Sequence, residues 1–293
     1  MIKVGTMKKV AAWASTVALA ATMMATLGSS ASATVTHSAM TTMSIGHRKA
    51  MTANDLANQQ HIVWAVAHED DLTLIAGASF VQHAEAKQAD GSPLYDLHVL
   101  VASDGQSSGV LPLLNANANG RYAPLTSADF IAARAREEVN GLTELLAGTG
   151  NSATLTFGHQ VDGSISVAET EYEINSIASV DPNHTWWLKG HSWYVDPEQD
   201  HRNVGLALKA LGPTLADGNV RYYMLPSMFT SPLLADVGGG HPIKPAATTL
   251  EYKNTINAYK AYCAWAPPQG MYAIGCTSVP KLFIVPVEDM YHV

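Results

Sequence analysis

Short apolar runs that alternate with helical patterns are the feature that most constrains the fold of this chain. HIVWAVA (61–67) and LHVLVAS (97–103) each have the length of a strand and lack the polar alternation of a half-buried one. Such runs are typical of strands that are buried on both faces, as in a parallel sheet. Helical patterns follow them at 72–88 and 127–148. Strands that alternate with helices predict βαβ units.

The rest of the chain continues this alternation. We expect further strands at 152–158, 184–190 and 220–226 and further helices at 204–212 and 250–265. The predicted fold class is therefore α/β, a Rossmann-like three-layer fold with a mostly parallel sheet and helices on both faces. Residues 59–293 suffice for a single domain of this kind. Residues 34–58 are polar and without clear period, and we interpret them as an N-terminal arm.

The first 33 residues have the pattern of a secretory signal peptide. Three lysines precede an apolar stretch, and an Ala-Ser-Ala step that ends at Ala33 follows it. Cleavage there would release a secreted bacterial protein, extracellular or associated with the cell wall, with no membrane span. A membrane anchor is the alternative, because the apolar stretch is just long enough to cross a bilayer. Its content of Ala and Thr and the cleavage-like step favour the signal peptide.

The charge of the chain argues against a nucleic-acid partner. Without the three lysines of residues 1–33, 25 acidic residues stand against 14 basic ones, a net charge of −11 with the histidines neutral. An acidic protein without a basic stripe is a poor binder of nucleic acid. The two cysteines, Cys263 and Cys276, are close in sequence, and in an exported protein we expect a disulfide between them. Two reduced, buried cysteines are the alternative.

Polar residues gather where the first strand ends. HEDD (68–71) follows the apolar run directly, and in open parallel sheets ligands bind at the carboxyl ends of strands. His68 and Asp71 are three residues apart at a helix start, so their side chains can point to one side. His201, in a second polar break before a helical pattern, would complete a three-ligand zinc site with an open position for water. Asp70 beside it would act as general base.

Each of these residues also has an ordinary structural explanation. Acidic residues are common at a helix start because they suit the helix dipole. A single histidine before an arginine is more often a surface or hydrogen-bonded residue than a ligand. Spacing alone therefore leaves the metal site open, and iron or manganese would accept the same donors as zinc.

Together, the two polar segments resemble motifs of the LmbE-like family, the zinc-dependent N-deacetylases of the GlcNAc-phosphatidylinositol de-N-acetylase (PIG-L) type. The family pattern is A-H-P-D-D-E after the first strand and H-P-D-H-x-x-(V/A)-G at a later helix start, and this chain has AHEDDL and EQDHRNVG. LHVLVASDGQSSGV is similar to the family's second strand and Gly-rich turn. RAREEVNGLTELLAG, with Arg134 and Glu137, is similar to the helix before the third strand, and INAYKAYCAW to the closing helix. The resemblance covers roughly residues 60–265.

The resemblance implies a metal site and a catalytic base. The ligands that it implies for one zinc ion per chain are His68, Asp71 and His201. The implied general base is Asp70, in agreement with the spacing. The turn that contains Ser103 and Asp104 would border the substrate pocket.

The chain departs from the family pattern in its second motif. Glu198 stands where the family has a histidine that helps to stabilise the tetrahedral intermediate or to protonate the leaving group. A carboxylate donates no hydrogen bond to an oxyanion unless it is protonated. We therefore expect His191, Tyr194 or another donor to take over, or a weaker or different activity. In the first motif Glu69 replaces a proline and Leu72 replaces a glutamate.

These observations predict a secreted, zinc-dependent amide hydrolase. It would remove an N-acetyl or other N-acyl group from an amino sugar or glycoconjugate, with a metal-bound water as nucleophile. The alternative is a catalytically weak or inactive secreted sugar-binding or cell-surface module on the same fold, which Glu198 favours and Asp70 opposes. A fatty-acyl or peptide-like amide is a third possibility. The substrate, the acyl group and the oligomeric state stay open.

Two further segments allow two interpretations each. HTWWLKGHSWY (184–194) is either an aromatic platform for a sugar or part of the core, since neighbouring side chains of a strand point to opposite faces. The Gly- and Pro-rich segment 236–245 is either a substrate lid or a surface loop.

Overall fold

The computed structural model describes residues 39–47, 51 and 56–293, so the expected signal peptide lies outside the described residues. The strands of the main sheet are β1 (Thr41–Gly46), β2 (Gln60–Val66), β3 (Tyr95–Ser103), β4 (Ser152–Gln160), β5 (Trp186–His191), β6 (Val220–Tyr223), β7 (His241–Ile243) and β10 (Asp289–His292). Strands β8 (Trp265–Ala266) and β9 (Met271–Tyr272) form a separate pair. The α-helices are α2 (Asp71–Glu85), α3 (Val110–Ala116), α4 (Ser127–Leu146), α5 (Val167–Ala178), α6 (Gln199–Leu215), α7 (Leu250–Tyr262) and α8 (Ile274–Ser278).

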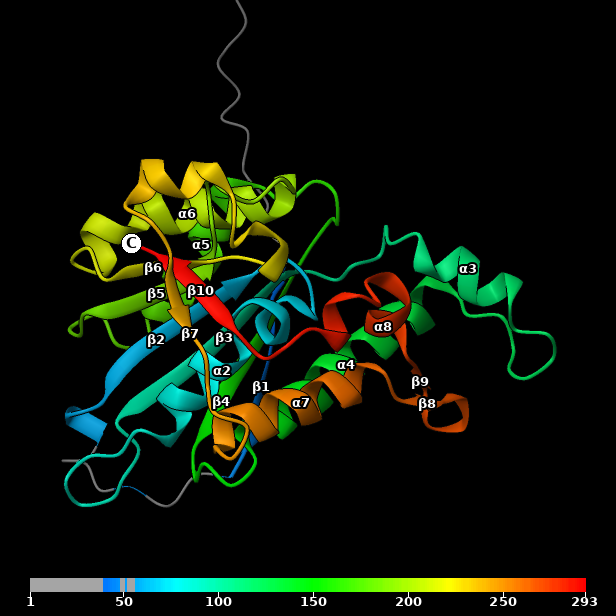
Figure 1. Ribbon diagram of the computed structural model, residues 1–293, viewed down its shortest axis with the longest axis horizontal. Helices are drawn as coiled ribbons and strands as arrows, with labels where there is room; N and C mark the ends of the chain where they lie inside the picture. Colours follow the sequence, from blue (N-terminus) through cyan, green and yellow to red (C-terminus); the bar gives the residue numbers. More distant parts are fainter. Residues whose placement is uncertain (1–38, 48–50, 52–55) are drawn as a thin grey trace, which may run out of the picture. The chain divides into compact units, whose positions relative to one another are not determined.

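The main sheet is mixed and mostly parallel. Its order is β1-β4-β3-β2-β5-β6-β10-β7. The five central strands, β4, β3, β2, β5 and β6, run parallel. At one edge β1 pairs antiparallel with β4, and at the other β10 pairs antiparallel with β6 and with β7. Helices α2, α4 and α7 cover one face and α5 and α6 the other (Figure 1). The predicted three-layer α/β fold is therefore confirmed.

The unbroken apolar run of β2 follows from this layering. Trp64 and Val66 pack into the core under α2, α4 and α7, whereas Val63 and Ala65 pack into the core under α5 and α6. All four side chains are fully buried. A strand in the middle layer has no solvent face, so a polar alternation is absent from its sequence.

The chain changes direction at the middle of the sheet. From β2 it passes through α2 to β3 on one side, and from β5 it passes through α6 to β6 on the other. Strands β2 and β5 are neighbours, so the loops that follow them diverge and leave a crevice at their carboxyl ends. In open α/β sheets this topological switch point is where ligands bind.

Several elements depart from the sequence-based expectations. The segment 34–58 has no clear period, yet residues 41–46 form β1 beside β4. Helix α6 begins at Gln199, ahead of the expected 204–212, because the Glu198 side chain accepts a hydrogen bond from the His201 N–H and caps it. The middle of segment 236–245 is the edge strand β7, paired with β10. Within the described residues, no helix is both long and apolar enough to cross a bilayer.

Cys263 and Cys276 form the expected disulfide. Cys263 ends α7 and Cys276 lies in α8, with 5.0 Å between their Cα atoms. The bond therefore ties the short helix α8, and the residues after it, to the long helix α7.

We predict that loss of this bond destabilises the protein. Closing a loop of this size lowers the entropy of the unfolded chain and contributes on the order of 3 kcal/mol. The double variant Cys263→Ser/Cys276→Ser should have a free energy of unfolding lower by about that amount, and therefore a lower urea midpoint. A reducing agent should lower the urea midpoint of the wild type but not that of the variant. Equal midpoints for both proteins under oxidising conditions would contradict the prediction.

Candidate active site

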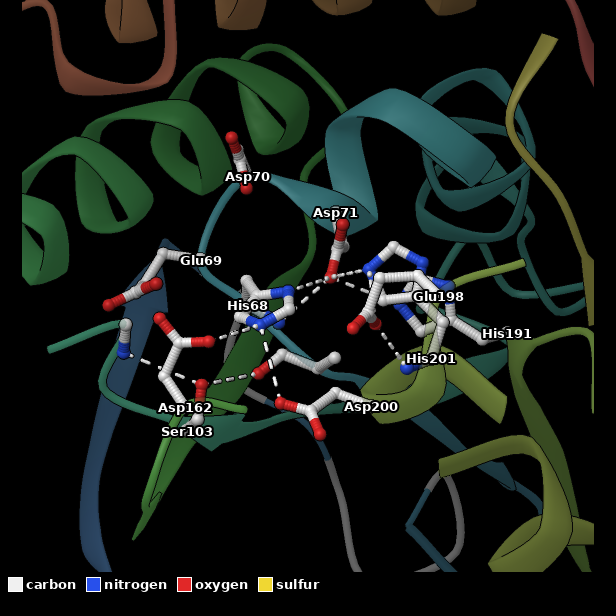
Figure 2. Close-up of polar contacts among 12 residues, drawn as sticks. His68, Glu69, Asp70, Asp71, Ser103, Asp162, His191, Glu198, Asp200 and His201 are labelled. Carbon is white, nitrogen blue, oxygen red and sulfur yellow. Dashed lines mark hydrogen bonds and ion pairs between the residues drawn. The ribbon is translucent and has the colours of Figure 1, made fainter. Parts of the chain in front are cut away.

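Two loops that follow neighbouring strands converge at the switch point. His68 lies in the loop after β2 and Asp71 is the first residue of α2, while His201 lies in the first turn of α6, after β5. Figure 2 shows Asp71 turned toward the histidine rings. Its Oδ2 atom lies 3.3 Å from His68 Nδ1, 3.4 Å from His201 Nε2 and 3.1 Å from His191 Nε2.

The outward nitrogens of two of these rings are bonded to other carboxylates. His68 Nε2 lies 3.2 Å from Asp162 Oδ1, and His201 Nδ1 lies 3.1 Å from Asp196 Oδ2. A carboxylate accepts hydrogen bonds, so when a ring is neutral, as metal binding requires, its proton lies on the nitrogen that faces Asp162 or Asp196. The nitrogens that face Asp71 then present lone pairs. Histidines that bind a metal usually donate their other ring N–H to a carboxylate in this way, which fixes the orientation of the ring.

The spacing of these donors fits a metal ion. Two ligands at 2.0–2.1 Å from a tetrahedral zinc ion lie about 3.3 Å apart. The two nitrogens are 3.3 and 3.4 Å from Asp71 Oδ2. The ligand atoms of His68, Asp71 and His201 all lie within 4.8 Å of one another. The residues present therefore match a three-ligand divalent metal site.

The electrostatics of the cluster also favour a positive charge at this point. Burial lowers the pKa of His68, but hydrogen bonds to Asp162 and Asp71 outweigh it and raise the pKa to about 10. The pKa of His201 also lies well above its usual value, since Asp71 and Asp196 outweigh its burial. His201 and His191 hold the pKa of Asp71 well below its usual range despite its burial. Protons and a metal ion thus compete for one centre.

His191 supports Asp71 from behind. Its ring is fully buried, and burial lowers its pKa, so the neutral ring can donate from Nε2 to Asp71. Its ring stacks on that of His201, with 3.9 Å between the centroids. Gly205 makes this packing possible, because a Cβ there would lie 2.6 Å from the His191 carbonyl oxygen. A glycine in α6 thus lets the helix lie directly against the end of β5.

Asp70 lies apart from this group (Figure 2). Its neighbour is the buried side chain of Arg134. Arg134 NH2 is 2.7 Å from Glu69 Oε2 and 3.7 Å from Asp70 Oδ1. Burial raises the pKa of Asp70, and Arg134 opposes that shift. Gly105, with a φ of +60°, is needed here, because a Cβ would collide with the Arg134 guanidinium. The glutamate in place of the family's proline therefore anchors the arginine beside Asp70.

Helix α4 links this loop to the wall formed by α8. Tyr262 donates from its hydroxyl to the Glu69 carbonyl oxygen at 2.8 Å and also contacts Glu138. Glu137 accepts hydrogen bonds from the N–H groups of Ile274 and Gly275 at 2.9 and 3.1 Å. The segment after β2 and the segment around the disulfide are thus held by the same helix.

A cavity of about 420 Å³ opens over the cluster. Its polar lining consists of His68, Asp70, Asp71, Ser107, Ser108, Arg134, Asp162, Asp196, Glu198, His201 and Ser278. Its apolar lining consists of Leu74, Pro197, Leu225, Val279 and Leu282. The volume is in the range of small-molecule sites. Five carboxylates line the cavity together with one arginine and two histidines, so its net charge depends on whether these histidines carry protons.

Four residues expected near the substrate do not line this cavity. His191 is buried behind Asp71, and the Tyr194 hydroxyl donates to Asp236 Oδ2 at 3.0 Å. The expectation that either one faces the substrate as a donor is therefore corrected. The Ser103 hydroxyl donates to the Ala67 carbonyl oxygen at 3.0 Å, and Asp104 Oδ1 accepts from the Gln106 N–H at 3.2 Å. Both hold the turn after β3 rather than facing the cavity.

Glu198, by contrast, lines the cavity. Its carboxylate caps α6 and its Oε2 atom lies 3.6 Å from His201 Nε2. The aromatic segment does not reach the cavity. Trp186 is fully buried in the core under α5 and α6, and no aromatic side chain of the described residues lines the cavity. Core packing is therefore the correct interpretation of the two tryptophans of β5.

Sequence reasoning missed the carboxylates that orient the histidines. Asp162 follows β4 in a Val-Asp-Gly turn, and Asp196 follows β5. Asp200 is a third such carboxylate, and it connects α6 to the turn that contains Asp162. It accepts hydrogen bonds from the N–H groups of Gly163 and Ile165 at 2.6 and 3.1 Å. Their positions after parallel strands were the available signal, because the carboxyl ends of such strands share one edge.

Solved structures with the same fold include a hydratase and deacetylases. No protein-family model and no curated protein matches the chain. The 4-carboxy-2-hydroxymuconate hydratase of Pseudomonas putida KT2440 is 19% identical, with a TM-score of 0.50 over 80% of this chain and 96% of that one. A triple mutant of a deacetylase of teicoplanin biosynthesis is 17% identical, with a TM-score of 0.50 over 76% and 88%. A deacetylase–teicoplanin complex is 14% identical, with a TM-score of 0.50 over 69% and 86%.

At these identities the likeness establishes the fold and nothing finer. The chain has the α/β fold that these hydratase and deacetylase structures share. The resemblance to the LmbE-like deacetylases found in the sequence is thereby confirmed as a resemblance of fold. Because one fold supports both a hydratase and deacetylases, the reaction has to be argued from the site.

The loop that carries Asp162 depends on a buried glutamate. Glu173 accepts a hydrogen bond from Gln160 Nε2 at 2.8 Å, and Gln160 Oε1 accepts one from the Ser166 N–H at 2.8 Å. Burial raises the pKa of Glu173 to about 8, and the hydrogen bond from Gln160 opposes the shift only in part.

We predict a pH-dependent gain in stability for Glu173→Gln. Between pH 4.5 and 8 the unfolded chain loses the Glu173 proton while the folded protein keeps it, so rising pH favours unfolding of the wild type. Glutamine removes this penalty. Urea unfolding at pH 5 and pH 8 should show the variant gaining stability relative to the wild type at the higher pH. Glu171→Gln, a partly exposed carboxylate on the same helix, is the baseline; a pH-independent difference for Glu173→Gln would refute the assignment.

Proposed function

We propose that this protein is a secreted, metal-dependent amide hydrolase that removes an N-acetyl or other N-acyl group from an amino sugar or glycoconjugate. The observation that carries the proposal is the floor of the cavity. Two imidazole nitrogens and one carboxylate of His68, Asp71 and His201 converge there at metal-ligand spacing, with the carboxylate of Asp70 on the same cavity wall.

Zinc is the metal that this donor set favours. Two imidazoles and one carboxylate are a typical ligand set of catalytic zinc, which keeps a position open for water or substrate. We assign one ion per chain to this centre, held by His68, Asp71 and His201. When bound, zinc supplies a Lewis acid for the amide carbonyl and lowers the pKa of water to near neutrality.

Asp70 takes the role of general base. Its carboxylate is buried at the cavity wall, where it can accept a proton from the attacking water and return it to the leaving amine. Arg134 holds this carboxylate in place and favours its charged form, because the guanidinium lies 3.7 Å from Asp70 Oδ1. Glu69 in turn fixes Arg134.

The charge of the cavity favours a neutral substrate. With the histidines neutral and the divalent ion bound, five carboxylates stand against one arginine and that ion, so the lining stays net negative and disfavours a phosphorylated or otherwise anionic substrate. A neutral N-acyl sugar meets no such repulsion, and its amine product is a cation that the carboxylates tolerate. The apolar side chains of Leu74, Leu225, Val279 and Leu282 form a surface for the acyl group.

The oxyanion needs a donor other than the family's histidine. Glu198 offers none in its ionised form. Arg134 and the hydroxyl groups of Ser107, Ser108 and Ser278 are donors that line the cavity, and we assign the role to this group. If none of them reaches the acyl oxygen, the protein is a sugar-binding module that keeps the metal but not turnover.

Secretion is part of the proposal. The leading residues have the pattern of a signal peptide. The disulfide between Cys263 and Cys276 is of a kind that persists in oxidising compartments. A secreted enzyme would meet glycans of the cell wall or the surroundings.

The proposal is tested by Asp70→Asn. We expect the variant to keep the metal content of the wild type and to lose turnover of N-acetylated amino sugars by roughly 10²–10⁴-fold, the usual contribution of a general base. Metal content and release of free amine are the two measurements. The matched control is Asp104→Asn, which changes a carboxylate outside the cavity and should leave both unchanged. Equal turnover in wild type and Asp70→Asn, or none in the wild type with any N-acyl sugar, would favour the binding module.

A second prediction concerns Glu198. The structure gives its carboxylate the role of a helix cap, so Glu198→Gln, which keeps an acceptor for the His201 N–H, should retain stability and turnover within about threefold. Glu198→Ala should cost about 1 kcal/mol of unfolding free energy. Urea unfolding and the same amine assay measure both. A loss of turnover in Glu198→Gln without a change in stability would assign the proton transfer to Glu198 instead.

A further inference from the structure

A second histidine–aspartate cluster lies at the opposite end of the sheet. It consists of His61 of β2 and of Asp96 and His98 of β3, near the amino ends of these two parallel strands. Figure 1 shows β2 and β3 side by side in the sheet. His61 pairs with Asp96 in the strand register, and His98 lies two residues further on the same face. His61 and His68 are at opposite ends of β2, about 20 Å apart along an extended strand. The cluster is therefore separate from the cavity.

The donor spacing of this cluster is that of the candidate active site. Asp96 Oδ2 lies 3.5 Å from His61 Nδ1 and 3.3 Å from His98 Nε2. The ligand atoms of the three residues all lie within 4.8 Å of one another. Two ligands of a tetrahedral zinc ion are about 3.3 Å apart. The three atoms can therefore hold one ion between them.

His61 is a buried group without a hydrogen-bonding partner. It is only 6% exposed, and within the described part of the chain neither of its ring nitrogens makes a hydrogen bond. Its nitrogens point at Asp96 and Asp181 from 3.5 and 3.4 Å, which is longer than a usual N–H···O bond. The Trp186 ring, with its centroid 4.7 Å away, closes one side. Such a buried, unbonded imidazole is costly unless something else binds it.

Asp181 and His184 form the support for this site rather than a second set of ligands. His184 Nδ1 lies 2.7 Å from Asp181 Oδ2, the distance of a charge-assisted hydrogen bond and too short for two ligands of one ion. Asp181 then faces His61 Nε2. This repeats the arrangement of Asp196 and His201, in which a carboxylate on one ring nitrogen turns the other toward the metal.

We propose that His61, Asp96 and His98 form a second divalent metal site, of zinc type, at the amino ends of β2 and β3. Asp96 is the ligand open to solvent, with a quarter of its side chain exposed, and gives the ion its entry path. The ion would join β2, β3 and, through Asp181, the segment before β5.

The experiment counts zinc ions in the full-length protein. After equilibration with zinc and removal of the free ion, we expect two ions per chain in the wild type, one in Asp96→Asn, one in His201→Ala and none in the double variant. Asp181→Asn should keep the second ion but bind it roughly 10- to 100-fold more weakly, since it removes only the support. His241→Ala, an exposed histidine outside both clusters, is the control and should keep two ions.

The outcome separates this proposal from the proposed function. The count lost on Asp96→Asn concerns only the second site, and the count lost on His201→Ala only the cavity. Zinc should also raise the melting temperature of His201→Ala but not that of His201→Ala/Asp96→Asn, and near-UV circular dichroism shows whether each variant is folded. Equal zinc content and equal melting shifts with and without Asp96→Asn would overturn the second site.

Discussion

The Oδ2 atom of Asp71 lies close to three imidazole rings and also accepts a hydrogen bond from the His68 N–H at 2.8 Å. Such a crowded carboxylate oxygen, almost closed to water, requires positive charge around it. The surrounding structure serves this requirement. Asp162 and Asp196 orient two rings, the cap at Glu198 places His201 in the first turn of α6, and a glycine in α6 lets that helix approach. A change in any of these parts acts on the same oxygen.

The fold explains why these groups meet, although they are far apart in the sequence. Residues 68–71 and 196–201 follow strands β2 and β5, which are neighbours in the sheet but whose connections leave in opposite directions. The crevice between the connections is a property of the topology and not of the residues that line it. This is why one fold accommodates hydratase and deacetylase structures, and why only the side chains in the crevice can distinguish the reactions.

The local pattern of apolar and polar residues predicted the layers and indicated His68, Asp71 and His201 as candidate ligands. It could do so because strand ends and helix starts are recognisable from a few consecutive residues. It did not predict which way side chains point. His191 is the last residue of β5, and its direction depends on the pleat of that strand and on the stacking against His201. Tyr194 turns to Asp236, a residue of the distant segment 236–245. Strand β1 was also not predicted, because it forms by pairing with β4 and its own polar sequence has no strand pattern.

The two histidine–aspartate clusters differ in what holds them. At the carboxyl end of β2 the ligands come from loops and a helix start, which can adjust around a substrate and which leave one side open to the cavity. At the amino end they come from the register of two buried parallel strands, where the position of each side chain is set by backbone hydrogen bonds. An ion in the first setting keeps room for chemistry, whereas an ion in the second is confined by the sheet. In the two proposals, the same types of donor at the two ends of β2 therefore serve catalysis at one end and stability at the other.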